Sequence, residues 1–186
     1  MIKPDLTEYF VSSEVLAQGK LLTVSCDQVR LANGHIAERE YVMHPGAVLI
    51  VPILANGNVI LERQFRYPLR QVFIELPAGK IDANEDVLHT GQRELLEETG
   101  YSASEWVRLG QTHPCIGYSN EVIHIYLARN LMAGKHERDA DENLEVFEMP
   151  FPQCLNMIVQ GEITDGKTIA ALFLADQFLQ AESAHG

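Results

Sequence analysis

The sequence predicts an α+β protein in which helices cover a mixed β-sheet as an α/β/α sandwich, preceded by a small antiparallel sheet. Three observations support this fold class. Short apolar runs recur between residues 47 and 149, Asn-Gly pairs mark tight turns between such runs, and few segments carry a helical pattern. The length of 186 residues fits one domain with a small appendage.

The N-terminal part of the chain differs in pattern from the rest, which predicts a division into residues 1–45 and 46–186. Residues 21–31 and 35–43 alternate loosely around an Asn-Gly pair, which favours an antiparallel hairpin. A sheet of this size has few residues with which to build its own core. It must therefore pack against the following domain or against a partner subunit, and the sequence leaves both possibilities open.

The larger region shows denser patterning. Strands are expected at 47–54, 59–65, 71–76, 106–111, 122–128 and 144–149, and helices at 151–159 and 167–179. Another helix is expected after Asn84, a candidate N-cap, and should end at Gly100, a candidate left-handed C-cap. Gly91 on the apolar side of this helix would allow close approach to a sheet.

Composition bounds the partners of the protein. The formal net charge of −12 opposes a nucleic acid as the main partner, because polyanions are bound by basic surfaces. The sequence has no apolar run near the ~20 residues that span a bilayer, and its first ten residues lack the apolar core of a signal peptide. Its three scattered cysteines are typical of reduced thiols. We therefore expect a cytoplasmic protein that binds neither nucleic acid nor a membrane.

The most informative segment is GKIDANEDVLHTGQRELLEETGY, residues 79–101. Glu97 and Glu98 follow Glu94 by three and four residues, so a helix would place their carboxylates in one patch. Such a patch repels itself unless a cation lies within it. Mg²⁺ suits the patch because it prefers carboxylate oxygens and retains waters that a phosphate can replace.

The wider spacing of this segment is distinctive. The pattern G-x5-E-x7-R-E-U-x-E-E-x-G-U, with U apolar, is matched by Gly79, Glu85, Arg93, Glu94, Leu95, Glu97, Glu98 and Gly100, with Tyr101 in the last position. The segment therefore resembles the Nudix box, and the chain resembles the Nudix hydrolases. A merely solvated acidic helix would not need glycines and an arginine at these spacings.

The resemblance implies a divalent-cation site, with Mg²⁺ as the expected ion and Mn²⁺ as a substitute. It assigns the carbonyl of Ala78 and the carboxylates of Glu94 and Glu98 as metal ligands, and Glu97 would complete or bridge the site. A metal held there suits the attack of water on a diphosphate linkage. We therefore expect a pyrophosphatase.

The same resemblance gives Glu85 and Arg93 the role of fixing the helix and orienting the metal ligands. Arg93 can also pair with Glu97, four residues further along the helix. The expected general base is Glu142, in the charged stretch HERDADENLE. Glu145 or a glutamate of the box is the alternative base.

Segments outside the box resemble the ADP-ribose pyrophosphatase branch of the family. They are LERQFR at 61–66, ELPAG at 75–79 and ADEN at 140–143. The resemblance implies hydrolysis of ADP-ribose or a related ADP-sugar to AMP and a sugar phosphate, by a homodimer formed through the N-terminal sheet. GDP-mannose or another nucleoside diphosphate sugar is the alternative substrate. A module that senses a nucleotide without cleaving it is the non-enzymatic alternative.

Carried over by position, Arg66 would contact the substrate phosphates, because an arginine at a strand end can bind two phosphate oxygens. Arg63 is a weaker candidate for the same contact. Glu75 would lie close to the metals or substrate, with a structural role equally open. In the loop HPCIGYSNE, Ser119 and Glu121 could bind ribose or order the loop.

Overall fold

The computed structural model describes residues 5–134 and 143–185. These residues group into two compact units. The smaller unit contains the described residues up to Pro45 together with Cys115–Glu121, and the larger unit contains Gly46–Pro114 and the described residues from Val122 onward. The loop Cys115–Glu121 thus joins the smaller unit, whereas the predicted division had placed it in the larger region. Each unit is described by itself.

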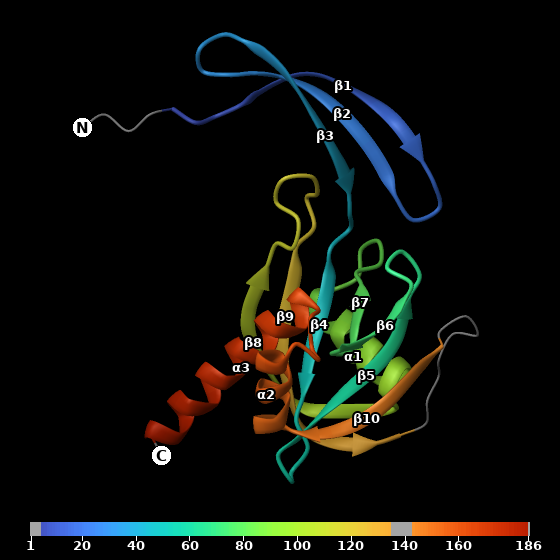
Figure 1. Cartoon of the computed structure of the whole chain (residues 1–186), viewed down its shortest axis with the longest axis vertical. Helices are drawn as coiled ribbons and strands as arrows, with labels where there is room; N and C mark the ends of the chain where they lie inside the picture. The colour runs from blue at the N-terminus through green and yellow to red at the C-terminus, as the bar shows by residue number, and fades with distance from the viewer. Residues whose placement is uncertain (1–4, 135–142, 186) are drawn as a thin grey trace. The chain divides into compact units, whose positions relative to one another are not determined.

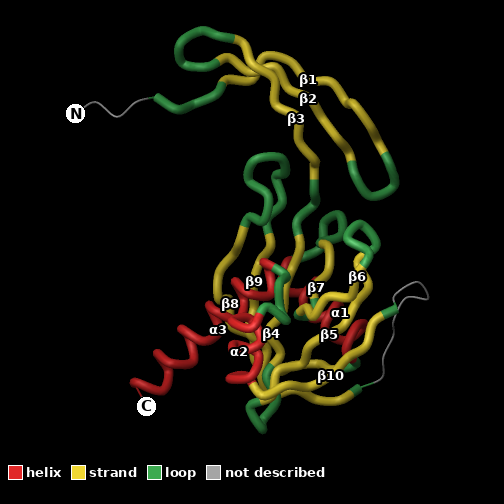
Figure 2. Tube along the Cα trace, viewed as in Figure 1, coloured by secondary structure: helices red, strands yellow, loops and turns green. Residues whose placement is uncertain are grey.

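The smaller unit is an antiparallel sheet in the order β1-β2-β3 (Figure 2). Its strands are β1 (Tyr9–Gln18), β2 (Thr23–Arg30) and β3 (Ile36–Met43). The predicted hairpin at Asn33-Gly34 is confirmed, and Gly34 has a φ of 84° that favours glycine. Strand β1 was missed, because all of its residues are exposed and its sequence YFVSSEVLAQ does not alternate strictly.

This sheet buries little apolar surface. Among its described residues, Val29 is the one buried hydrophobic side chain. The exposed large hydrophobic side chains are Tyr9, Phe10, Val11, Val15, Leu16, Leu21, Leu22, Ile36 and Met43. The unit therefore presents apolar surface of the kind that marks an interaction site.

The loop Cys115–Glu121 is attached to the end of β3. Val42 donates its N–H to the carbonyl of Tyr118 at 2.8 Å, and Asn120 donates its N–H to the carbonyl of Val42 at 3.4 Å. The Asn120 side chain also accepts the N–H of His44 at 2.7 Å. These bonds extend the sheet by a short bridge.

The larger unit contains two sheets and the helices that cover them (Figure 1). Its elements are β4 (Ala47–Pro52), β5 (Asn58–Arg66), β6 (Gln71–Glu75), β7 (Ala78–Lys80), α1 (Val87–Thr99), β8 (Tyr101–Thr112), β9 (Ile123–Ala133), β10 (Leu144–Pro150), α2 (Phe151–Gln160) and α3 (Gly166–His185). One sheet has the order β7-β4-β9-β8, in which β4 runs parallel to β9 and the other pairs are antiparallel. The antiparallel second sheet has the order β10-β5-β6. The predicted mixed sheet is confirmed.

Strand β4 forms the centre of the sandwich. Leu49 and Val51 pack into the cluster that contains residues of α2 and α3. Val48 and Ile50 pack on the opposite face, with Leu95 of α1. Both faces of the sheet are covered, which explains why the run AVLIVP is apolar throughout rather than alternating. In the described part of the chain, no helix is long and apolar enough to cross a membrane.

The turn at Asn56-Gly57 forms, but the predicted hairpin around it is wrong. Gly57 has a φ of 82°, and Leu54 donates its N–H to the carbonyl of Asn58 at 2.9 Å. Beyond a single bridge between Ile53 and Val59, the flanking strands diverge. The reason is that β7 and β9 already occupy both edges of β4, so β5 joins the other sheet.

The start of α1 also differs from the prediction. Asp86, rather than Asn84, is the N-cap, and its carboxylate accepts the N–H groups of Leu88 and His89 at 3.0 and 3.1 Å. Asn84 instead adopts a φ of 67° in the preceding turn. The predicted C-cap at Gly100 is confirmed by its φ of 76°.

The predicted close approach at Gly91 of α1 is confirmed. A Cβ at this position would lie 3.1 Å from Cγ1 of Val48 in β4. Helix α1 can therefore pack directly against the sheet. This packing fixes the position of the acidic face of α1 relative to β4 and β7.

Candidate active site

Arg93 lies at the centre of the acidic patch on α1. Its Nε and Nη2 donate to the two oxygens of Glu85, each at 3.0 Å. Its Nη1 donates to Glu94 at 2.9 Å and to Glu97 at 2.8 Å. Nη2 also reaches the carbonyl of Lys80 in β7 at 3.4 Å. One planar guanidinium therefore fixes three carboxylates relative to one another and to the sheet.

Glu85 is held by several donors besides Arg93. The hydroxyl of Thr90 donates to it at 2.8 Å, the N–H of Asp82 donates at 3.3 Å, and Nδ1 of His89 lies at 3.1 Å. Arg93 holds the pKa of Glu85 far below its usual value, and Thr90 and Asp82 lower it further against the effect of burial. Glu85 is therefore ionised, and its lone pairs are used to brace the helix, which fits the predicted positioning role.

Glu94 and Glu98 are the most buried acidic groups of the patch, with 9% and 6% of their surface exposed. Glu98 accepts the backbone N–H of Ala78 at 3.0 Å. A Cβ on Gly79 would lie 1.8 Å from the carboxyl carbon of Glu94. The Ala78-Gly79 backbone thus lies directly against both carboxylates, and only glycine leaves room for Glu94 in this position.

The donor set of this patch fits a divalent cation. Carboxylate and backbone carbonyl oxygens are the hard ligands that Mg²⁺ prefers, and Gly79 leaves a space filled by the Glu94 carboxylate. Within residues 5–134 and 143–185, no three His, Cys, Asp or Glu side chains converge closely enough to hold an ion by themselves. Mg²⁺ commonly uses one or two carboxylates together with waters and substrate phosphates. The assignment of Ala78, Glu94, Glu97 and Glu98 as ligands stays a prediction.

A second charged cluster surrounds Glu75. Arg66 binds both oxygens of this carboxylate, with Nε at 2.6 Å and Nη2 at 2.7 Å. Nζ of Lys167 donates to the same carboxylate and to Asp165, the latter at 2.9 Å. Burial of Glu75, which is only 3% exposed, raises its pKa, but Arg66 and Lys167 outweigh this effect and the net pKa is lowered.

Lys167 and Asp165 were not among the predicted site residues. Asp165 caps α3 by accepting the N–H of Thr168 at 3.0 Å, and this places Lys167 in the first turn. An acidic N-cap followed by a lysine is visible in the sequence DGKT. The sequence does not show, however, that this helix start meets Glu75.

The two clusters are joined by the backbone between Glu75 and Ala78. The N–H of Leu76 donates to the hydroxyl of Thr168 at 3.0 Å, and the N–H of Ala78 donates to Glu98. The charge of Glu98 also contributes to the raised pKa of Arg66, after the larger effect of Glu75. Acidic and basic groups therefore adjoin within the larger unit.

Comparison with known proteins identifies the family. Residues 43–172 match the NUDIX domain, and residues 11–42 match the nucleoside diphosphate sugar hydrolase N-terminal domain. The chain belongs to the NUDIX family. The predicted resemblance to the Nudix hydrolases and the predicted Nudix fold are thereby confirmed.

Relatives of this Nudix protein match along nearly its whole length. It is 35% identical over 181 residues to an ADP-ribose pyrophosphatase of Bacillus subtilis (strain 168), covering 96% of each chain. It is also 35% identical over 181 residues to a methanol dehydrogenase activator of Bacillus methanolicus, covering 95% of each. The crystal structure of an ADP compounds hydrolase has a TM-score of 0.87 at 24% identity, covers 97% of this chain and 98% of its own, and shares the fold.

Among the remaining described candidates, Arg63 and Glu145 lie together on the paired strands β5 and β10. Arg63 bonds Glu145 at 3.1 Å and stacks over the ring of Phe147 at 3.9 Å. Arg63 and Arg66 are three residues apart on β5, and this odd spacing directs their side chains to opposite faces of the strand. Glu142, the predicted general base, lies outside the described residues.

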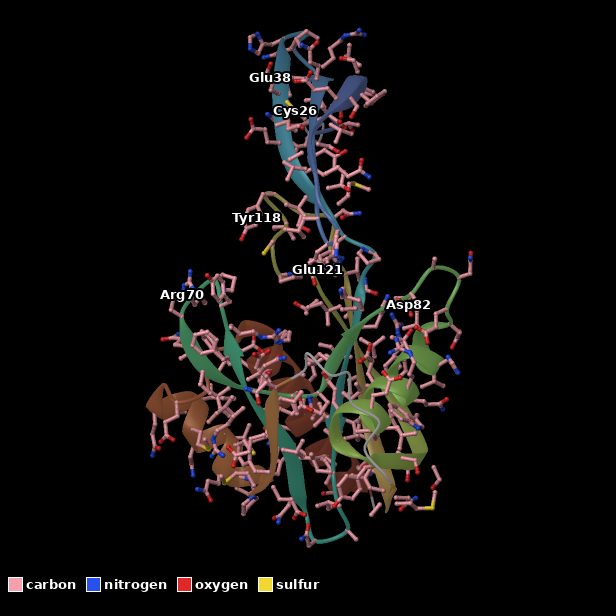
Figure 3. The ribbon with its side chains drawn as sticks, turned by 90° about the vertical axis from the view of Figure 1, so that its right-hand side faces the viewer. Cys26, Glu38, Arg70, Asp82, Tyr118 and Glu121 are labelled. Carbon is pink, nitrogen blue, oxygen red and sulfur yellow. The ribbon has the colours of Figure 1, made fainter. Side chains whose placement is uncertain are left out.

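Ser119 and Glu121 belong to the loop of the smaller unit (Figure 3). The hydroxyl of Ser119 accepts the N–H of Glu121 at 3.1 Å. The carboxylate of Glu121 lies 3.6 Å from Nδ1 of His44. These contacts order the loop, which was one of the two predicted roles, and ribose binding by these residues stays a prediction.

Proposed function

We propose that this Nudix protein is a Mg²⁺-dependent pyrophosphatase that cleaves ADP-ribose or a related ADP-sugar to AMP and a sugar phosphate. The observation that carries the proposal is the Arg93 clamp, in which one guanidinium gathers Glu85, Glu94 and Glu97 beside the Ala78-Gly79 backbone. The name of the Bacillus subtilis relative supports ADP-ribose as the substrate.

A divalent cation bound at the acidic patch would neutralise phosphate oxygens and lower the pKa of an attacking water. The residues of the chain prepare this site. Arg93 and the Ala78 N–H hold the carboxylates of Glu94, Glu97 and Glu98 in place, so binding an ion requires little rearrangement. Because Arg93 offsets the mutual repulsion among these carboxylates, the patch would be ordered before a metal ion or substrate binds.

Arg66 is our candidate for binding the diphosphate. Glu75 occupies the edge formed by Nε and Nη2, which leaves the Nη1 edge of the guanidinium for phosphate oxygens. The side chain of Arg66 is 45% exposed, whereas that of Glu75 is 4% exposed. The arginine is therefore accessible to a substrate and is oriented from behind by the carboxylate.

A substrate panel tests the proposed function. ADP-ribose, ADP-glucose, GDP-mannose, NADH and 8-oxo-dGTP are incubated with Mg²⁺, and release of AMP, GMP or pyrophosphate is measured. We expect the highest kcat/KM with ADP-ribose or ADP-glucose. A clear preference for GDP-mannose would select the alternative substrate class. Binding of nucleotide and metal without hydrolysis of any compound would instead select the sensing module.

The metal requirement is tested on the same reaction. EDTA should abolish turnover, Mg²⁺ should restore it, and Mn²⁺ should substitute for Mg²⁺ because both bind carboxylate oxygens. Full activity after exhaustive chelation would contradict a metal-dependent mechanism.

We propose Glu142 as the general base, with Glu145 as the alternative. Glu142→Gln should lower kcat by about 10²- to 10⁴-fold, as expected for loss of general base catalysis, without changing the Mg²⁺ concentration that gives half-maximal activity. Glu145→Gln is the matched control, since Glu145 pairs with Arg63. Near-normal turnover of Glu142→Gln with a large loss in Glu145→Gln would move the role to Glu145.

We also propose that residues 1–45, which contain the sheet of the smaller unit, form a dimerisation element whose partner is a second copy. The exposed Phe10 and Val15 on the edge strand β1 support this, because exposed apolar edges are usually covered. Light scattering after gel filtration should show a dimer that Phe10→Ser with Val15→Ser converts to a monomer. Leu69→Ser, at an exposed apolar site of the larger unit, is the control. A wild-type monomer would contradict the assignment.

The scattered free cysteines and acidic charge also support a cytoplasmic location without nucleic-acid or membrane partners. Cell fractionation tests this proposal. Recovery in the membrane or extracellular fraction would contradict it.

A further inference from the structure

We propose that Lys167 is a positioning residue for substrate binding: it compensates the charge of buried Glu75, so that the charge of Arg66 is available to the diphosphate. The inference rests on the proposed function, because it takes Arg66 as the residue that contacts the phosphates. It adds α3, the last helix of the described chain, to the elements that build the site.

The geometry places Lys167 behind the substrate-facing arginine. Its Nζ donates to the same Glu75 oxygen that accepts Nη2 of Arg66. The Lys167 side chain is 18% exposed, compared with 45% for Arg66. Its ammonium is also bonded to Asp165. The lysine is thus engaged by two carboxylates and acts on a ligand through Glu75 and Arg66 rather than by direct contact.

The charges explain why a second cation is needed. A carboxylate as buried as Glu75 must be paired, because an isolated buried charge is costly. If Arg66 were its sole partner, the pair would be neutral and the arginine would attract an anion weakly. Lys167 makes the group of Arg66, Lys167 and Glu75 positive, and with Asp165 included the cluster is neutral rather than negative. Asp165, the second carboxylate bound to the lysine, accepts the N–H of Thr168 in the first turn of α3, where the positive end of the helix dipole stabilises its negative charge.

The surrounding acidic groups make this compensation more important. Glu62 lies directly opposite Glu75 in the strand register, and the charge of Glu98 reaches Arg66. A diphosphate therefore approaches a region with many carboxylates. Without Lys167, the region around Arg66 would carry one more net negative charge and would repel the substrate.

The first test compares Lys167→Met, Lys167→Arg and Arg129→Met, on the best substrate of the panel. Lys167→Met should raise KM by about tenfold with less than about a threefold change in kcat, and Lys167→Arg should restore KM to within about threefold. Arg129→Met is the matched control. It removes another part-buried cation that anchors α3, through Glu182 at 2.7 Å, but lies outside the Glu75 cluster. Its KM should equal that of the wild type.

The second test is a double-mutant cycle with Glu75→Gln. Glutamine keeps an oxygen that can accept a hydrogen bond from Arg66 but carries no charge to compensate. Adding Lys167→Met to Glu75→Gln should therefore change KM by less than about threefold, because the charge that Lys167 balances is already gone. Circular dichroism and thermal melting establish that each variant is folded.

The outcomes separate the possible failures. An unchanged KM in Lys167→Met, or a lowered melting temperature with a loss in kcat alone, overturns the inference. The same tenfold penalty in the Glu75→Gln background also overturns it, because Lys167 would then act on the substrate independently of Glu75. If wild type and Arg129→Met hydrolyse none of the panel compounds, the proposed function is wrong, and the inference that rests on it is wrong as well.

Discussion

The Arg93 cluster and the Glu75 cluster use the same kind of ion pair with a different balance of charge. In the first, one arginine lies among Glu85, Glu94 and Glu97. In the second, one buried carboxylate lies between Arg66 and Lys167. Each cluster fixes its central group by a bidentate arginine contact. The net charge is negative around Arg93, whereas the charges of Arg66, Lys167, Glu75 and Asp165 cancel one another.

This difference matches the two parts of a metal-diphosphate ligand. On the proposed function, a cation would be attracted to the carboxylates of α1, and phosphate oxygens would be attracted to Arg66. The backbone from Glu75 to Ala78 joins the two clusters, through the N–H of Leu76 and the N–H of Ala78. The carboxylates of α1 and the guanidinium of Arg66 can therefore lie close together without pairing with each other, because each is already paired with other side chains.

The largest effect should follow from breaking the acidic cluster. Glu98→Gln removes a buried charge proposed to bind the metal, so kcat/KM should fall by about 10³-fold, comparable to the loss of a strong electrostatic contact in a transition state. Activity as a function of Mg²⁺ concentration measures the change. Glu182 lies on α3 and pairs with Arg129, away from the acidic patch. Glu182→Gln is therefore the control, and it should leave the Mg²⁺ dependence unaltered. An unaltered Mg²⁺ dependence in Glu98→Gln would mean that the acidic cluster is not the cation site.

The next largest effect tests the Glu75 cluster. Arg66→Met should lower kcat/KM by about 10²-fold, mainly through KM, because it removes a charge-assisted contact with phosphate. The Mg²⁺ dependence should not change. Arg70→Met is the control, since Arg70 stacks on Tyr67 at the tip of the β5–β6 hairpin (Figure 3). Equal losses in both variants would show that general positive charge, rather than Arg66, governs affinity.

A smaller effect is expected from Gly79→Ala. The new methyl group would overlap the carboxylate of Glu94, which can swing away because it ends a flexible side chain. The fold should therefore survive while the Mg²⁺ concentration for half-maximal activity rises by about tenfold, as expected when a ligand is misplaced. Gly19→Ala places its methyl 3.7 Å from the nearest atom, the carbonyl of Leu22, and is the control. Normal Mg²⁺ activation of Gly79→Ala would separate Glu94 from metal binding.

The smallest effect concerns stability at acid pH. The folded-state pKa of Glu75 lies below its usual value of 4.5, because Arg66 and Lys167 outweigh the effect of burial. Its ionised form therefore stabilises the fold above the unfolded pKa, and that contribution is lost as the pH falls through the folded pKa. In urea unfolding from pH 7 to pH 3, Glu75→Gln should lose less stability than the wild type. Parallel stability profiles would contradict net pairing of Glu75 in the folded protein.

The acidic cluster could be predicted from the sequence because its members are local. Arg93 and Glu97 are four residues apart on α1, and Glu85 directly precedes the N-cap of that helix, so all three are close in sequence. The cap of the same helix was predicted wrongly. Asn84 and Asp86 can both cap a helix, and the choice depends on where the chain leaves β7, which spacing does not show.

In the Glu75 cluster, Arg66 and Glu75 were predicted but Lys167 and Asp165 were not, because the members of this cluster are distant in sequence. Lys167 follows Glu75 by 92 residues, and the contact depends on how α3 packs against β4 and β8. Strand β1 was missed for a related reason: a strand exposed on both sides has no buried face to impose alternation on its sequence. Periodicity reveals which side of an element is buried, but it does not reveal which distant element covers it.

The bond between the Leu76 N–H and the Thr168 hydroxyl has a consequence for synthesis of the protein. The whole Nudix box leaves the ribosome well before Asp165, Lys167 and Thr168 are made. A nascent chain can therefore contain every box residue while the backbone before Ala78 still lacks its brace and Glu75 lacks its second cation. Domains generally fold as units during synthesis. The diphosphate side of the site would then be completed last, which delays capture of nucleotide sugars until the final helix has begun to form.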